Sequence, residues 1–156
     1  MSNSAELTTT KMQIRRIDYA TDPLAPQAGE LIYRSVLYGL DPGHDAAAEY
    51  HYAFGSFDNF CAVEQPTGRL LGVAALSVSA RQSGTGFIEN VAVVPATRGQ
   101  RVGASLIEHL EVEALHSGVT QLQVQSLHQA VGFYKKLGYM SHVRQIPDLL
   151  VKQLII

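Results

Sequence analysis

Residues 88–104, with the sequence IENVAVVPATRGQRVGA, restrict the fold of this chain more than any other segment. A β-branched run ends at Pro95 and is typical of a strand, and the residues after it begin an amphipathic stretch that predicts a helix. A strand that enters a helix through a glycine-bearing turn forms an anion site, because the first helical N–H groups have no backbone partner and the helix dipole is positive there. Arg98 and Arg101 lie in the same turn. The segment therefore predicts a site for a phosphate or pyrophosphate.

The bulk composition indicates one soluble globular domain. The chain has 156 residues, of which 46% are hydrophobic and 17% charged, and its formal net charge is −2. Nothing in this balance favours binding to nucleic acid or to an anionic membrane, and no apolar run approaches the length of a membrane span. The polar start lacks the features of a secretory signal, so a cytoplasmic location is predicted. The single cysteine, Cys61, excludes an internal disulfide, and we find no metal-binding constellation.

The order of predicted elements indicates a mixed sheet. Residues 1–10 are predicted to be disordered, and residues 11–156 to form the domain. Strands are predicted over residues 11–17, 59–64, 70–79, 86–94, 121–125, 139–145 and 149–156, and helices over residues 25–37, 46–53, 101–116 and 129–137. The last two strands are predicted to be separated by Pro147-Asp148, and the glutamates of the third helix, Glu108, Glu111 and Glu113, to face outward. The crossover through residues 101–116 implies one parallel pair in an otherwise mostly antiparallel sheet of about seven strands, with helices on both faces, in the α/β class of the α+β type.

Two motifs resemble those of the GNAT superfamily of acyl-CoA-dependent N-acyltransferases. The family's phosphate turn has Gln or Arg, two variable residues, Gly, one variable residue and then Gly or Ala. Here residues 98–103 read RGQRVG and follow Val-Val-Pro. The second family motif is matched by residues 130–139, AVGFYKKLGY. The resemblance covers nearly the whole chain from about residue 11 and implies a single-domain GNAT fold.

The resemblance implies acetyl-CoA as the cosubstrate and assigns residues to it. These are Val91, Ala92, Val93, Arg98, Gly99, Gln100, Arg101, Val102, Gly103, Ala104 and Tyr134. The backbone of the strand would pair with the amide-bearing pantetheine arm as another strand does. The sequence departs from the family pattern at Arg101, where the family has glycine, and at Leu127, where members often have asparagine. We expect a helical φ at Arg101, because a Cβ penalises the left-handed region.

The resemblance places Tyr134 as a general acid near the departing sulfur, and the residues suggest Glu89 as a base. Deprotonating an alkylamine with a pKa of about 10.4 costs roughly 4.6 kcal/mol at pH 7, whereas protonating a thiolate with a pKa of about 8.5 gains only about 2 kcal/mol. A base should therefore matter more than an acid. Alternation along the strand predicts that Glu89 shares a face with Phe87, Val91 and Val93. An ordinary half-exposed glutamate is the equal alternative, and His44, His51 and His128 are weaker candidates.

The resemblance implies an N-acetyltransferase in which a primary amine of a small molecule or peptide attacks the thioester directly. Tyr33, Tyr38, Tyr50 and Tyr52 lie in the region that forms the acceptor side in this family. One alternative is a non-catalytic acyl-CoA-binding or regulatory module. Another is a relative acting on a carboxylate-bearing or phosphorylated molecule, for which Arg34 and Arg81 are the candidate contacts. The apolar residues 149–156 are expected to form an edge strand that could pair in a homodimer.

Overall fold

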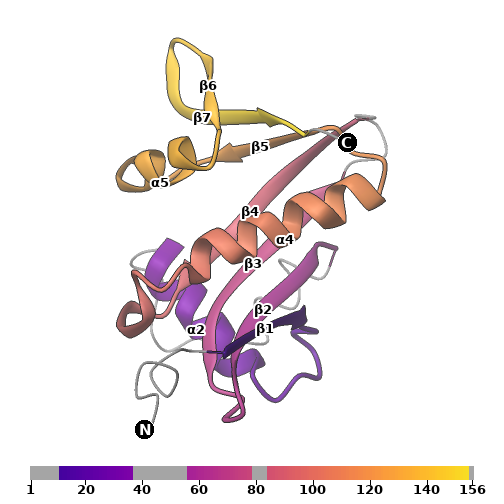
Figure 1. The fold of residues 1–156 in the computed structure, drawn as a ribbon, viewed down its shortest axis with the longest axis vertical. Helices are drawn as coiled ribbons and strands as arrows, with labels where there is room; N and C mark the ends of the chain where they lie inside the picture. The colour runs from indigo at the N-terminus through magenta and orange to yellow at the C-terminus, as the bar shows by residue number, and fades with distance from the viewer. Residues whose placement is uncertain (1–10, 37–55, 79–83, 155–156) are drawn as a thin grey trace, which may run out of the picture.

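A seven-stranded sheet forms the centre of the computed structural model, which describes residues 11–36, 56–78 and 84–154 (Figure 1). The strands are β1 (Lys11–Arg16), β2 (Asp58–Gln65), β3 (Leu70–Val78), β4 (Thr85–Val93), β5 (Gln121–Gln125), β6 (Met140–Val143) and β7 (Ile146–Gln153). The helices are α2 (Ala25–Val36), α4 (Val102–His116) and α5 (Val131–Lys136), with 3₁₀ turns η1 (Pro95–Thr97) and η2 (His128–Ala130). The predicted mixed, mostly antiparallel sheet of seven strands is confirmed, while the helix predicted over residues 46–53 lies outside the described residues.

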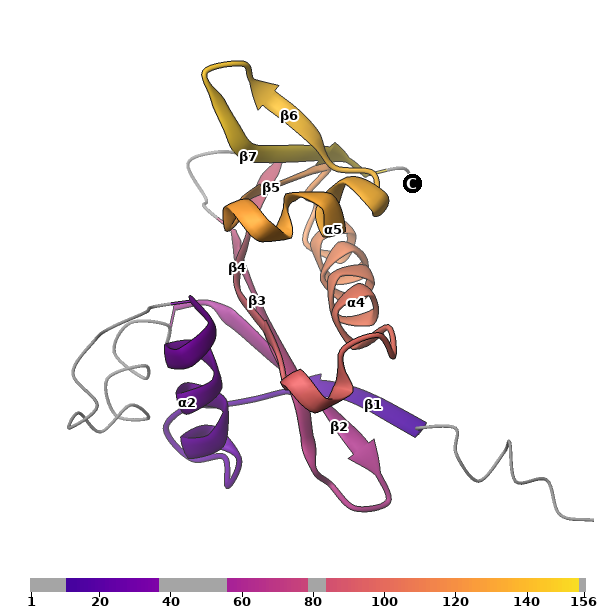
Figure 2. The ribbon, with the colours of Figure 1, turned by 90° about the vertical axis from the view of Figure 1, so that its left-hand side faces the viewer.

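Helices cover both faces of the sheet, as the sequence predicts (Figure 2). On one face α4 packs on β2, β3 and β4, and it buries Leu106, Ile107 and Leu110 completely. On the other face α2 packs on β3 and β4 and buries Ala28 and Ile32. Two separate apolar cores therefore hold the sheet from opposite sides.

The sheet opens at its centre, between β4 and β5. These strands form its parallel pair, and their register runs only from Thr85↔Gln121 to Ile88↔Val124. Beyond Ile88, β5 turns away from β4 and leaves the second half of β4 without a partner on that side (Figure 1). The gap exposes backbone hydrogen-bonding groups in the middle of the protein, which is the feature that positions the site.

A β-bulge in β4 corrects the predicted direction of one side chain. The register passes from Val73↔Ala92 to Ala75↔Glu89, so β4 contains one residue more than β3 there, and Asn90 has a φ of +54°. The extra residue reverses the alternation. Val91 and Val93 pack toward the α4 core, whereas Glu89 shares the opposite face with Phe87. The prediction that Glu89 shares a face with both valines is thus wrong.

The C-terminal hairpin also differs from the prediction. Pro147 and Asp148 lie inside β7, and the turn falls at Arg144 and Gln145, because Val143 pairs with Ile146. In the strand order β5-β7-β6, β7 is an inner strand, so the predicted edge strand at residues 149–156 is wrong. Among the described helices, none is long and apolar enough to span a membrane.

Candidate functional site

The turn between β4 and α4 leaves backbone N–H groups pointing out of the start of a long helix. Gly99 has a φ of +85°, a conformation that glycine adopts without penalty. The first bond of the helical pattern runs from the Ser105 N–H to the Arg101 carbonyl, at 2.9 Å. The N–H groups of Val102, Gly103 and Ala104 precede that bond and are left over by the helix. This is the geometry of an anion site.

Arg101 contradicts the conformation predicted for it. Its φ is +62° and its ψ is +20°, so it keeps the left-handed conformation of the glycine that it replaces. The tight turn into α4 fixes the backbone, and the side chain adapts: the guanidinium donates to Glu108 across 2.8 Å at the exposed surface. A left-handed conformation costs a residue with a Cβ about 1–2 kcal/mol.

We expect Arg101→Gly to be more stable than Arg101→Ala by about 0.5–1 kcal/mol. Both variants lose the guanidinium, and only glycine relieves the strain of the left-handed backbone. The greater conformational entropy of glycine in the unfolded state offsets part of this gain. Urea denaturation of the two variants measures the difference. Equal free energies of unfolding would show that the backbone at this position carries no strain.

A groove runs from this turn to α5. Its volume is about 770 Å³, and we refer to it as the wide groove. It is lined by Ser35, Val91, Ala92, Val93, Thr97, Arg98, Gly99, Arg101, Val102, Gly103, Ala104, Leu127, Gln129, Ala130, Phe133, Tyr134 and Lys136. Three of these residues are cationic and, among those described, none is acidic. The wide groove therefore suits an anionic, elongated ligand.

The wall of the wide groove formed by β4 offers backbone groups. The Val94 N–H donates to Leu71 on β3 at 2.8 Å. Because successive residues of a strand direct their backbone groups to opposite sides, the N–H and carbonyl of Val93 face the open edge. An extended ligand with amide groups could pair there as a missing strand would.

Tyr134 lies where the wide groove meets a second cavity, and it lines both. Its side chain is buried, and its ring packs edge-on against Phe133 and Tyr139, with ring centroids 5.0 and 5.8 Å apart. Among the described residues its hydroxyl has no hydrogen-bond partner, and burial raises its pKa above the ordinary value. The hydroxyl is therefore a neutral group that can donate a proton or a hydrogen bond.

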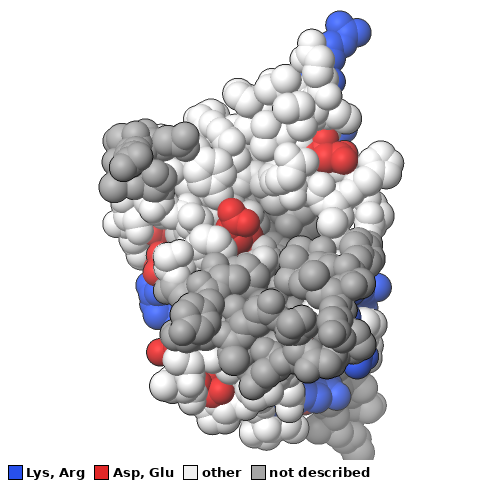
Figure 3. All heavy atoms as spheres, turned by 180° about the vertical axis from the view of Figure 1, so that it is seen from behind, with Lys and Arg blue, Asp and Glu red and all other residues white. Residues whose placement is uncertain are grey.

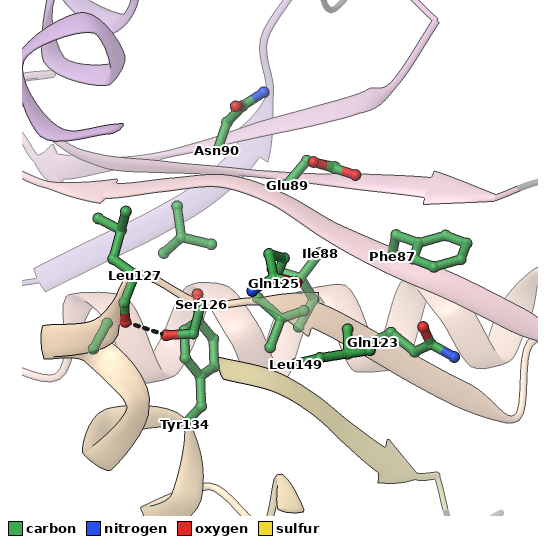
Figure 4. Close-up of a pocket in the computed structure, with 13 residues that line it drawn as sticks. Phe87, Ile88, Glu89, Asn90, Gln123, Gln125, Ser126, Leu127, Tyr134 and Leu149 are labelled. Atoms are coloured by element: carbon green, nitrogen blue, oxygen red, sulfur yellow. Dashed lines mark hydrogen bonds between the residues drawn. The ribbon is translucent and has the colours of Figure 1, made fainter. Parts of the chain in front are cut away.

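The second cavity, which we refer to as the inner cavity, lies in the gap between β4 and β5 (Figure 4). Its volume is about 320 Å³. Glu89 from β4 and Tyr134 from α5 both line it. Glu89 is half-buried, no partner of its carboxylate is found among the described residues, and burial raises its pKa. A carboxylate of this kind can accept a proton closer to neutral pH than an exposed one.

The structure brings the predicted coenzyme residues and both predicted catalytic residues to these two connected spaces, with one exception. Gln100 is exposed and does not line the wide groove. Of the weaker histidine candidates, His128 is exposed, and its Nδ1 lies 3.5 Å from Oδ1 of Asp148. The other candidates lie outside the described residues, and so do three of the tyrosines: His44, His51, Tyr38, Tyr50 and Tyr52. Cys61 is buried, and burial raises the pKa of its thiol to about 11, which agrees with an inert role.

Sequence reasoning missed several lining residues. Phe133 and Lys136 belong to the second motif, whose Tyr134 alone was assigned a role. Asn90 and Gln123 line the inner cavity, and only the bulge in β4 and the divergence of β5 from β4 could have identified them.

One predicted outward-facing glutamate supports the site from behind. Glu111 on α4 accepts a hydrogen bond from the Tyr139 hydroxyl at 2.8 Å and pairs with Lys152 of β7 at 3.0 Å. Its side chain is only 15% exposed, so its predicted outward orientation is wrong. Tyr139 in turn packs against the ring of Tyr134. The network fixes the position of the Tyr134 ring relative to α4.

On the face opposite to the view of Figure 1, the described acidic and basic side chains lie in separate small groups (Figure 3). The described residues contain no group of three or more His, Cys, Asp or Glu that could hold a metal ion.

Comparison with known proteins assigns the family. The model of the acetyltransferase (GNAT) family matches residues 30–139, and the chain belongs to this family. Glucosamine 6-phosphate N-acetyltransferase from Trypanosoma brucei brucei is 35% identical over 91 residues, which are 56% of this chain and 60% of that enzyme. The aligned part thus spans less than two thirds of that relative.

Solved structures share the fold. An acetyltransferase from Trypanosoma brucei has a TM-score of 0.64 and 26% identity, covering 86% of this chain and 96% of that one. N-acetylglutamate synthase from Neisseria gonorrhoeae, in complex with coenzyme A and L-arginine, has a TM-score of 0.72 and 19% identity, covering 93% of this chain and 34% of that one.

Proposed function

We propose that the protein is an N-acetyltransferase that transfers the acetyl group of acetyl-CoA to a primary amine of a small molecule. The observation that carries this proposal is the connection of two unlike spaces at Tyr134: a cationic groove on one side and a cavity with a carboxylate on the other. Membership of the GNAT family supports acyl transfer, and the coenzyme A in the related N-acetylglutamate synthase crystal supports the cosubstrate.

The residues of the wide groove fit coenzyme A. Its diphosphate would lie against the free N–H groups at the start of α4, between Arg98 and Lys136. Its pantetheine arm would pair with the open edge of β4 at Val93. A Cβ placed at Gly103 would lie 3.2 Å from the Phe133 ring, so the narrow space there is kept by the absence of a side chain.

The proposed reaction is a direct attack within a ternary complex. The amine loses a proton to Glu89, its nitrogen forms a bond to the thioester carbonyl carbon, and the bond from that carbon to sulfur breaks. The departing sulfur takes its proton from the Tyr134 hydroxyl, which burial keeps neutral at pH 7. The ammonium form of the acceptor has one proton more than Glu89 removes before the attack, so the bonded nitrogen returns this second proton to the tyrosinate, and Glu89 releases its proton to water. The proposal is supported by the placement of Glu89 and Tyr134, which line the same cavity from β4 and from α5.

The experiment follows coenzyme A binding by calorimetry and thiol release from acetyl-CoA in the presence of a panel of amines. Binding together with amine-dependent thiol release is the expected result. Binding with no release for any amine or peptide would favour the non-catalytic acyl-CoA-binding module, and the absence of binding at millimolar coenzyme would overturn both.

Tyr134→Phe tests the acid. We expect kcat to fall by about thirtyfold at most at pH 7, because protonating a thiolate with a pKa of about 8.5 gains only about 2 kcal/mol there. The affinity for coenzyme A should stay unchanged, since the ring remains. Steady-state kinetics and calorimetry on the same preparation measure the two quantities, and an unchanged kcat would remove Tyr134 from the mechanism.

A further inference from the structure

Neutral polar side chains form part of the lining of the inner cavity. Three side-chain amides line it, from Asn90, Gln123 and Gln125, together with the hydroxyl of Ser126. Glu89 is the one group among its described lining residues that carries a charge at pH 7. Glu89 and Asn90 are neighbours on β4, and both line the inner cavity (Figure 4).

The amide of Asn90 lacks a partner. Its Nδ2 is buried and makes no hydrogen bond in the structure. A buried donor without an acceptor is costly, so Nδ2 would gain a hydrogen bond if the Asn90 side chain turned toward the inner cavity and a ligand there supplied the acceptor. A hydroxyl oxygen of the acceptor molecule would satisfy it. The amides of Gln123 and Gln125 can both donate to and accept from further hydroxyl groups.

The volume of the inner cavity limits the size of the ligand. About 320 Å³ lies at the lower end of the range for small-molecule sites, which begins near 300 Å³. A single ring with its substituents fits this space, and a peptide would leave most of its length outside.

The charge of Glu89 limits the ligand further. Its carboxylate attracts the ammonium form of the acceptor and repels any anionic group that enters the same small space. A phosphate on the acceptor would therefore be unfavourable there, in contrast to the substrate in the name of the trypanosomal relative.

From these observations we propose that the acceptor is a hydroxyl-bearing amine of single-ring size without an anionic group, as in an amino sugar that carries no phosphate. This inference rests on the proposed acetyltransferase function and deepens it. The Glu89 carboxylate would pair with the ammonium group, and the amides of the inner cavity would form hydrogen bonds with the hydroxyl groups.

Three acceptors test the proposal in the same thiol-release assay: glucosamine, glucosamine 6-phosphate and cyclohexylamine. We expect glucosamine to have the highest kcat/KM, at least about tenfold above each of the others. A higher value for glucosamine 6-phosphate would overturn the exclusion of anions, and a higher or equal value for cyclohexylamine would overturn the recognition of hydroxyl groups. Either result leaves the acetyltransferase function intact, whereas failure of all amines would contradict that function itself.

Two variants test whether the amides of the inner cavity bind the hydroxyl groups of the acceptor. Asn90→Gly keeps the positive φ and removes the amide, and Gln123→Leu removes a second amide at nearly constant size. Each is expected to lower the ratio of kcat/KM for glucosamine to kcat/KM for cyclohexylamine by about tenfold. Saturation-transfer NMR of glucosamine with each protein gives a readout independent of turnover, and the signal should weaken in both variants. An equal loss for both amines, or unchanged glucosamine binding in both variants, would contradict the proposal.

Discussion

Glu89→Gln should lower kcat/KM for an alkylamine by up to about 10³-fold at pH 7, because deprotonating an amine with a pKa of about 10.4 costs roughly 4.6 kcal/mol there. Glutamine has the same shape and cannot accept the proton. The half-buried position of Glu89 at the inner cavity is what makes it available to the amine and only partly to water. Steady-state kinetics with saturating acetyl-CoA measure the effect.

The role of Glu89 as a base also predicts the direction in which activity changes with pH. Glu89 accepts a proton only when ionised, and burial raises its pKa, so activity should fall as the pH drops through a midpoint above the ordinary value of about 4.3. That limb should vanish in Glu89→Gln, and the variant should approach the wild type at high pH, where the amine deprotonates by itself. Glu64→Gln is the matched control, since Glu64 pairs with Arg69 on the surface of β2. A Glu89→Gln profile parallel to that of the wild type would assign the base to another group.

Gly103→Leu should weaken coenzyme A binding by more than about 100-fold. Even a Cβ at this position lies 3.2 Å from the Phe133 ring and 3.5 Å from Val93, and the remainder of a leucine side chain has to enter the wide groove. The helical N–H groups stay in place, so the loss arises from blocked space rather than from a changed turn. Calorimetry with coenzyme A measures it.

Gly132→Leu is the control for this substitution. Gly132 lies in α5, and a Cβ there meets no atom within 4 Å. It should bind coenzyme A like the wild type. Circular dichroism and thermal unfolding of both variants check that Gly103→Leu is folded. A folded Gly103→Leu that binds coenzyme A normally would place the ligand elsewhere.

How much could be predicted from the sequence depended on whether the pattern was local. The strand, turn and helix of residues 88–104 follow from alternation, glycine and helical spacing, and the order of strands follows from the lengths of their connections. The family motifs gave Tyr134 and about half of the residues that line the wide groove, whereas Glu89 followed from its place on the strand.

The failures share a cause, which is that tertiary pairing overrides a local rule. The bulge at Asn90 reverses the alternation after Glu89, and no property of the neighbouring residues announces it. Arg101 takes a left-handed conformation because the entry into α4 demands it. Pro147 lies within β7, before the residues that pair with β5 begin at Leu149, so its missing N–H removes no bond to that strand.

Among the described strands, the four register pairs between β4 and β5 join the two halves of the sheet, and each half holds one proposed catalytic residue. Glu89 belongs to the N-terminal half, and Tyr134 belongs to the C-terminal half. Helix α4 contacts both halves. It packs on β2, β3 and β4 of the N-terminal half, and its Glu111 bonds to Tyr139 and Lys152 of the C-terminal half. The distance between the proposed acid and base therefore depends on the angle at which the two halves meet, and a substitution at Glu111 or Lys152, neither of which lines the inner cavity, would change that distance.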